Sequence, residues 1–182
     1  GVPIADVVTG LFAAVSAVTG LVARQPHQGA TIQVPLLESM MSALINQAQG
    51  YLVTGDEPGR LGNDHPSIAP YGPITVADGA VMLAVGTDAQ FAGLDRALGG
   101  RLLQHEPAWA GNGERVVQRM QLREVLEQHF ATMTMDESVS LLSRHGVPCA
   151  PILSVAEAIN QSARLPCWYW SRQARIRYFW CR

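Results

Sequence analysis

The sequence contains no lysine, and all 13 basic residues are arginine. Schiff-base chemistry, a phosphate-binding P-loop and a lysine general base each need a lysine amine, so these residues supply none of them. Cysteines are few, odd in number and scattered: Cys149, Cys167 and Cys181. This usage argues against a disulfide framework and is typical of a reducing compartment, so a cytoplasmic location is expected.

Long apolar runs and strong charge are also missing. No stretch of eighteen residues is apolar without a polar interruption, and no basic segment precedes a short apolar one. Neither a membrane span nor a secretion signal is therefore predicted. The formal net charge is only −2, so no nucleic-acid partner is expected. The GxGxxG, HExxH and GxSxG motifs do not occur.

The histidines and Cys149 give no sign of a metal site. None of the five histidines pairs with a cysteine or another histidine at a recognised ligand spacing, so no metal is assigned. Cys149 lies four residues after His145, but a Gly-Val-Pro break separates them. Cys149 is therefore interpreted as a small buried side chain, not as a nucleophile.

Charge is distributed unevenly along the chain. Residues 1–163 hold all 15 acidic residues and eight arginines, whereas residues 164–182 hold five arginines, no acid and three of the four tryptophans. A basic, aromatic segment can bind nucleic acid or a membrane surface. This one has no regular period, so residues 161–182 are interpreted as an atypical tail unrelated to the evolved fold, for example from a shifted reading frame.

The first part of the chain reads as two apolar helices. Apolar residues recur at helical spacing over residues 5–24 and again over 36–53, with a short strand predicted at 30–35. Gly10 and Gly20 are predicted to mark close packing of another element. Because both helices are apolar on more than one side, we expect them to be buried inside a larger assembly or a dimer.

Residues 54–72 are rich in glycine and proline and are predicted to be a linker. After them, two apolar runs flank Asp78-Gly79, a signal for a type I′ hairpin. Two capping boxes, at Thr87–Gln90 and Thr134–Glu137, predict helix starts. With a helix at 115–131 and a strand at 147–153, residues 73–160 are expected to form a small α+β domain. The fold class is thus mixed α/β, with residues 1–53 a part of a larger domain.

Asp6 is the first candidate functional residue. It immediately precedes the first apolar helix pattern. Unpaired N–H groups and the helix dipole favour an ionised carboxylate there, and such a carboxylate is a competent nucleophile towards an activated acyl group. A capping role explains the same position equally simply, and spacing alone favours it.

The second candidate is the loop from Arg60 to Gly72. It combines polar groups, an aromatic ring and backbone breakers, as active-site lids do, and Asn63, His65 and Tyr71 are its candidate substrate-facing residues. An ordinary linker with a packed tyrosine is the alternative. A further series, Arg115, Arg119 and Arg123 at i, i+4 and i+8, is interpreted as a solvated helix face that pairs with nearby glutamates.

An ordered set of motifs resembles the class III CoA-transferases of the CaiB/BaiF type. The set comprises Gly1-x-Pro3-Ile4-x-Asp6-x-x-Thr9-Gly10, Gln33-Val34-Pro35-Leu36-Leu37-Glu38, Tyr51-Leu52-x-x-Gly55, Arg60-x-Gly62-Asn63-x-His65-Pro66, Ala69-Pro70-Tyr71-Gly72, Ala77-Asp78-Gly79 and Gly146-Val147-Pro148-x-Ala150-Pro151. Each motif is weak alone, but together they run in order from residue 1 to about residue 160.

The resemblance implies an acyl-CoA:carboxylate CoA-transferase in which Asp6 attacks the thioester and then carries CoA as an aspartyl-CoA thioester. Acyl-CoA and a carboxylic acid would be its substrates, and no prosthetic group is implied. The loop after Asn63 would cover the reacting centre. The family fold implies an interlocked homodimer in which each chain has a large domain and a small domain.

Relatives of this type are about twice as long, and the segment missing at the front supplies most of their CoA-binding surface. We therefore expect this chain to be a fragment that is inactive by itself. An acyl-CoA racemase of the same family, in which an aspartate at this position moves a proton, remains an alternative. So does a non-catalytic dimerisation fragment.

Overall fold

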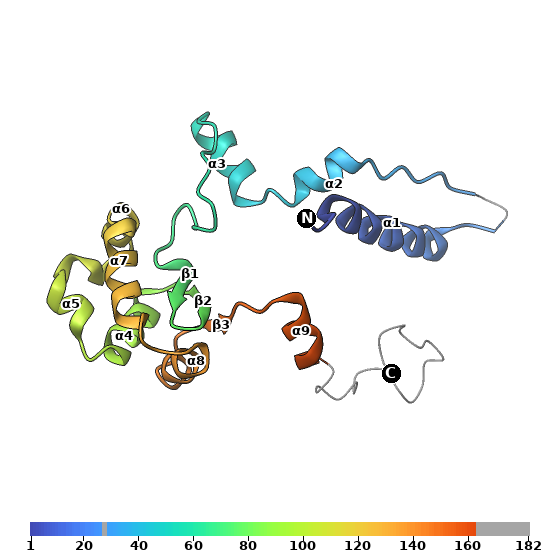
Figure 1. Cartoon of the computed structure of the whole chain (residues 1–182). Coiled ribbons are helices and arrows are strands. Elements are labelled where there is room, and N and C mark those ends of the chain that lie inside the picture. Colours follow the sequence, from blue (N-terminus) through green and yellow to red (C-terminus); the bar gives the residue numbers. More distant parts are fainter. Residues whose placement is uncertain (27–28, 163–182) are drawn as a thin grey trace. The chain divides into compact units, whose positions relative to one another are not determined.

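The computed structural model describes residues 1–26 and 29–162 and divides the chain into two compact units (Figure 1). The first is Gly1–Arg60, and the second starts at Leu61, inside the segment predicted to be a linker. Cys167, Cys181 and all but the first two residues of the atypical tail lie outside the described residues.

The described residues of the first unit form three helices, α1 (Ile4–Ala23), α2 (Leu36–Ser42) and α3 (Asn46–Thr54). Helix α1 confirms the prediction for residues 5–24, and α2 packs against it. A Cβ atom added at Gly20 would lie 2.8 Å from Cδ1 of Ile32, so Gly20 allows the close approach that was predicted. A Cβ at Gly10 would meet no atom within 4 Å, and the described residues do not bear out the prediction there.

Two predictions for the first unit are wrong. Residues 30–35 form no strand, because the described part of this unit offers no strand edge to pair with. The helix predicted over 36–53 is broken between α2 and α3, where Ile45 has a φ of 40°. Hydroxyl groups of Ser39 and Ser42 bond backbone carbonyls in the preceding turn. This competition favours the end of the helix, which an apolar period does not reveal.

Burial of the first helix is also not found within this chain. Helix α1 buries no residue, and its large apolar side chains are exposed along its length. The chain supplies too little structure in this unit to cover an apolar helix on all sides. By length and composition α1 could also span a membrane, although core helices of soluble proteins meet the same criterion.

The second unit is built on an antiparallel sheet in the order β1-β2-β3, formed by β1 (Tyr71–Val76), β2 (Gly79–Ala84) and β3 (Cys149–Pro151). The predicted hairpin is confirmed, but its turn is not type I′. Val76 pairs with Gly79, so Ala77 and Asp78 form the loop, and neither has the positive φ that a type I′ turn requires. Instead, Asp78 accepts a hydrogen bond from the backbone of Met135, 2.7 Å away.

The helices in the described part of the second unit are α4 (Asp88–Ala97), α5 (Arg101–His105), the 3-10 helix η1 (Pro107–Ala110), α6 (Asn112–Val117), α7 (Arg119–Phe130), α8 (Met135–Arg144) and α9 (Val155–Ser162). Helix α7 packs on β1 and α8 on β2 and β3 (Figure 1). Side chains that alternate along β1 and β2 meet them in one core: Ile74, Val76, Val81, Leu83, Val85, Phe91, Leu94, Leu102, Trp109, Leu122, Leu126, Phe130, Leu142 and Val147.

The single helix predicted over 115–131 is instead two, α6 and α7, which meet at Gln118. The strand predicted over 147–153 is confirmed only at Cys149–Pro151. Helix α5 and η1 were not predicted, because they are too short to show a period. The buried carboxylate of Asp95 supports α5 by accepting hydrogen bonds from the amides of Leu102 and Leu103.

Both predicted capping boxes are confirmed. Thr87 and Gln90 exchange bonds at the start of α4, and Thr134 and Glu137 do so at the start of α8. The Thr134 backbone N–H and, secondarily, its hydroxyl donate to the Glu137 carboxylate and lower its pKa below the ordinary 4.5.

This shift predicts a pH-dependent stability. Since the pKa of Glu137 is lower in the folded chain, its stabilising effect is present above about pH 4.5 and is lost as pH falls through the folded value. Urea unfolding of Glu137→Gln and the unmodified protein should therefore differ in stability at pH 7, and this difference should shrink at an acidic pH below the folded pKa of Glu137. Glu124→Gln, an exposed change on α7, should show no such convergence. An equal gap at both pH values for Glu137→Gln would contradict the assignment.

Candidate functional site

Asp6 lies in the first turn of α1 and does not cap it. Pro3 occupies the N-cap position, and no side chain bonds the helix start. The carboxylate of Asp6 is exposed, and no hydrogen bond or ion pair to it is formed within residues 1–26 and 29–162. The capping interpretation is therefore wrong. What remains is a carboxylate beside free helix N–H groups and the positive end of the dipole.

The loop from Asp64 to Pro70 is bonded by side chains of two helices. It forms no helix or strand of its own. Side chains that project from α6 and α7 at positions 112, 115 and 119 instead bond its backbone, and the one at position 123 bonds the Asp64 side chain. These side chains donate or accept the bonds that a strand partner would otherwise provide.

Arg115 is the innermost of these side chains and is 0% exposed. Its Nε donates to the carbonyl of Ala69 at 2.7 Å, and its Nη1 donates to the carbonyls of Trp109 and Ala110 at 2.7 and 3.0 Å. Nη2 pairs with Asp88, and the guanidinium lies 4.3 Å from the ring centre of Phe91. A buried cation is tolerated here because these donors and the charge all have partners.

Arg119 and Asn112 hold the middle of the loop. Arg119 donates from Nη1 to the carbonyl of His65 and from Nη2 to that of Pro66, each at 3.0 Å. The Asn112 amide donates to the carbonyl of Ser67 at 2.8 Å and accepts from the amide of Ala69 at 3.2 Å. Consecutive carbonyl groups of the loop are thus bound by one helical face.

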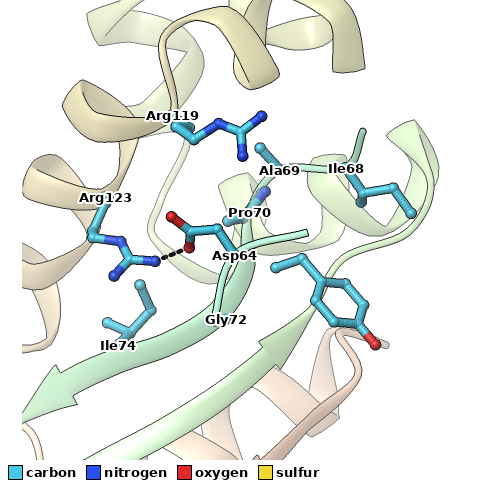
Figure 2. A pocket seen from close by; sticks show the side chains of 9 residues that line it. Asp64, Ile68, Ala69, Pro70, Gly72, Ile74, Arg119 and Arg123 are labelled. Atoms are coloured by element: carbon cyan, nitrogen blue, oxygen red, sulfur yellow. Dashed lines mark hydrogen bonds and ion pairs between the residues drawn. The ribbon is translucent and has the colours of Figure 1, made fainter. Parts of the chain in front are cut away.

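Arg123 holds the start of the loop through an ion pair with Asp64 (Figure 2). Gly72, with a φ of 147°, leaves room for this pair, because a Cβ there would lie 3.1 Å from Oδ1 of Asp64 and 3.3 Å from Nη2 of Arg123. The adjacent cavity has a volume of about 20 Å³. That volume holds about one water molecule, so the cavity is a packing gap and not a substrate pocket.

The predicted loop residues are partly brought together. The rings of His65 and Tyr71 are 5.3 Å apart, centre to centre, and inclined at 56°. Asn63 is exposed at the start of the loop. All three lie in the second unit and Asp6 lies in the first, so the meeting of Asp6 with this loop stays a prediction.

The arginine series was misread from sequence. It is not a solvated face paired with glutamates, because Arg115 is buried and Arg119 and Arg123 bond the loop. A usable signal was present. Pro66 and Pro70 leave the loop with fewer N–H groups than carbonyls, and each arginine brings five donors and no acceptor. A donor-rich helix face elsewhere in the unit was therefore to be expected.

Other titratable groups of the described residues have structural explanations. Burial is the main cause that lowers the pKa of His129, followed by the charges of Arg101 and His105. Bonds from the Ser154 hydroxyl and amide lower the pKa of Glu157. Cys149 is half-buried, with its Sγ 3.9 Å from the carbonyl of Val139. Within residues 1–26 and 29–162, no three His, Cys, Asp or Glu side chains gather into a metal site.

Comparison with known proteins identifies the ancestry of both units. Residues 1–165 match the family model of CoA-transferase family III. The succinate–glutarate CoA-transferase of Agrobacterium fabrum is 33% identical over 158 residues, which cover 86% of this chain and 40% of that protein. The human succinyl-CoA:glutarate CoA-transferase is 31% identical over 153 residues, covering 84% and 35%.

Solved structures agree with this match. The crystal structure of a CaiB/BaiF family protein from Brucella suis is 37% identical, with a TM-score of 0.72, and the match covers 88% of this chain and 43% of that one. The chain thus spans about two-fifths of the length of the relatives it matches. With a family match that extends over nearly all of its described residues, the chain belongs to CoA-transferase family III, the CaiB/BaiF group.

Proposed function

We propose that the protein to which this chain belongs transfers coenzyme A between carboxylic acids, with Asp6 as the covalent carrier. The observation that carries the proposal is the family match over residues 1–165, which includes Asp6 and the loop up to Tyr71. The two transferases described above are named for succinate, succinyl-CoA and glutarate. Small dicarboxylates and their CoA thioesters are therefore the first substrates to test.

The chemistry of Asp6 would proceed by four acyl exchanges. Its carboxylate oxygen attacks the thioester carbon of the donor, and the CoA thiolate leaves, which gives a mixed anhydride. The thiolate then attacks the aspartyl carbon and releases the donor acid, so that CoA is joined to Asp6 as a thioester. The acceptor carboxylate displaces the thiolate in turn. The thiolate finally takes the acceptor acyl group and restores the Asp6 carboxylate.

The surroundings of Asp6 suit the first of these steps. An attacking carboxylate must be ionised and sterically accessible, and Asp6 is exposed within the described chain. The N-terminal turn of α1 favours the ionised form through the helix dipole. No residue of α1 is buried in this chain, so the helix itself offers an uncovered apolar surface around that carboxylate.

That uncovered surface supports the homodimer and the larger domain that the family fold implies. Eight large apolar side chains of α1 are each at least 44% exposed: Ile4, Val7, Leu11, Phe12, Val15, Val18, Leu21 and Val22. A contiguous apolar face of this kind is normally covered by further protein. We propose that the rest of the large domain and a second copy cover it, in a cytoplasmic enzyme that binds neither nucleic acid nor membrane.

The loop from Asn63 to Tyr71 is proposed to cover the reacting centre. Loops that exclude water from an acyl intermediate must hold a defined conformation when closed. The support for this role is the set of bonds from α6 and α7, which gives the segment a fixed backbone without a strand partner. His65 and Tyr71 are the side chains through which it would touch the substrate.

A chimera tests the proposal. The matched segment of the Agrobacterium fabrum transferase is replaced by residues 1–160 of this chain, which restores the parts that this chain does not contain. The purified chimera, incubated with succinyl-CoA and glutarate, should form glutaryl-CoA, whereas this chain alone should form none. Circular dichroism and the oligomeric state confirm that the chimera is folded.

Two outcomes would contradict the proposal. One is a folded chimera with no CoA exchange for any dicarboxylate pair. The other is exchange of the proton beside the thioester carbonyl, followed as deuterium uptake from heavy water, without transfer to an acceptor acid. The second outcome would identify the racemase alternative, because that reaction moves a proton and leaves the thioester intact.

A further inference from the structure

Arg119 donates hydrogen bonds from its two terminal nitrogens to two successive backbone carbonyls, those of His65 and Pro66. Its third donor, Nε, bonds the carbonyl of Val116 at 3.0 Å. The guanidinium is therefore anchored to the end of the preceding helix α6 on one side and to the loop on the other. Its planar fork fixes both the position and the orientation of the peptide between the two loop carbonyls.

The residues that follow this peptide set the state of the imidazole. The amide of Ser67 donates to Nδ1 of His65 at 3.2 Å, and the Ser67 hydroxyl lies 3.4 Å from the same nitrogen. An Nδ1 that accepts from an amide N–H carries no proton, so the neutral ring has its proton on Nε2. The ring is also packed against Tyr71. The contacts with Ser67 depend on the path of the backbone from residue 65 to residue 67.

We propose that Arg119 is a positioning residue, which acts through the loop backbone to fix the orientation and the Nε2–H tautomer of His65. The proposal rests on the proposed function in one respect: it gives the covering loop a neutral N–H donor, which is the type of group that binds the carbonyl oxygen of a CoA thioester. The claim that Arg119 fixes the orientation and tautomer of His65 depends only on hydrogen bonds within the second unit.

The test uses the full chain with ¹⁵N-labelled histidine. Nitrogen NMR at a pH where His65 is neutral distinguishes a protonated from an unprotonated ring nitrogen. In the unmodified chain, the His65 signals should show protonated Nε2 and unprotonated Nδ1. In Arg119→Gln, they should move to the averaged values of mixed tautomers, and the Ser67 amide should exchange with solvent about tenfold faster. Arg144→Gln removes an exposed arginine charge from α8 and should change neither.

Arg119→Lys separates positioning from simple charge. A lysine keeps the charge and can reach one carbonyl but cannot form the planar fork. In this variant the amides of α4 and α8 should keep their protection from hydrogen exchange. The His65 nitrogen signals and the Ser67 exchange rate should lie between those of the wild type and Arg119→Gln. If the amides of Arg119→Gln lose hydrogen-exchange protection throughout the second unit, that variant is unfolded. The Arg119→Lys variant then decides whether Arg119 positions His65. The proposal is overturned if the folded lysine variant keeps the wild-type tautomer and Ser67 exchange rate.

An activity measurement in the chimera adds the functional part. Arg119→Lys should lower kcat about tenfold and change KM for succinyl-CoA less than about twofold, because the loop is proposed to act on the reacting centre and not on the CoA nucleotide. A raised KM at constant kcat would overturn that part. If the chimera transfers no CoA, the proposed function fails while the NMR result still decides the role of Arg119.

Discussion

Replacing Asp6 with asparagine in the chimera is expected to lower the rate of CoA transfer by at least about 10³-fold. An amide of nearly the same shape keeps the first turn of α1, in which Asp6 makes no capping bond. It has no ionised oxygen to attack the thioester, so no covalent carrier forms. Removal of a group that makes and breaks bonds affects kcat far more than KM. The measurement is the initial rate of glutaryl-CoA formation at saturating succinyl-CoA.

Asp136→Asn is the matched control. Asp136 is an exposed carboxylate in the first turn of α8 and so has the same helical setting as Asp6. Its replacement should leave the transfer rate within about twofold, since an exposed charge outside the site contributes little. A chimera that retains most of its rate as Asp6→Asn while folding normally would show that another group carries CoA.

Replacing Arg115 with methionine is expected to destabilise the second unit by roughly 3–5 kcal/mol. Methionine fills much of the space of the arginine stem but donates no hydrogen bond. The carbonyls of Ala69 and Trp109, both buried residues, and that of the exposed Ala110 would be left without the donor they have now. Each buried polar group that loses its partner costs about 1–3 kcal/mol. The loop would then lose its attachment at Ala69 as well.

Hydrogen exchange at the amides of Leu122 and Leu126 measures this effect, because both side chains are fully buried in the core of that unit. Asp88→Asn is the control. Its carboxylate is 63% exposed, so loss of the ion pair with Arg115 should cost less than about 1 kcal/mol. If both variants lose the same amount of stability, then Arg115 stabilises the unit through the exposed ion pair and not through its bonds to the buried carbonyls.

Sequence patterns predicted those parts of the fold that short-range physics determines. The capping boxes at Thr87 and Thr134 are complete within four residues, and the structure forms both. The hairpin was predicted from two apolar runs that flank a short polar turn. The predicted turn type was wrong because Asp78 accepts a hydrogen bond from Met135, a residue distant in sequence. The conformation of the turn therefore does not depend on a glycine within it.

What could not be predicted depends on distant partners. The spacing of Arg115, Arg119 and Arg123 was visible, but a helical period does not tell whether a charged face meets water or a loop some fifty residues earlier. The break at Ile45 was hidden in the same way, because apolar spacing continues across it. Short elements such as α5 depend on Asp95, whose carboxylate replaces a local cap. Asp6 was found from its motif, and within the described residues its carboxylate is exposed.

The central claim is that CoA becomes bonded to Asp6. The most direct measurement is to incubate the chimera with succinyl-CoA, treat it with hydroxylamine and analyse its tryptic peptides by mass spectrometry. Asp6 is the only carboxylate side chain between Gly1 and Arg24, so a hydroxamate in that stretch identifies it. We expect this modification, dependent on succinyl-CoA and absent from Asp6→Asn. A chimera that transfers CoA but carries the hydroxamate on another residue, or on none, would contradict the account.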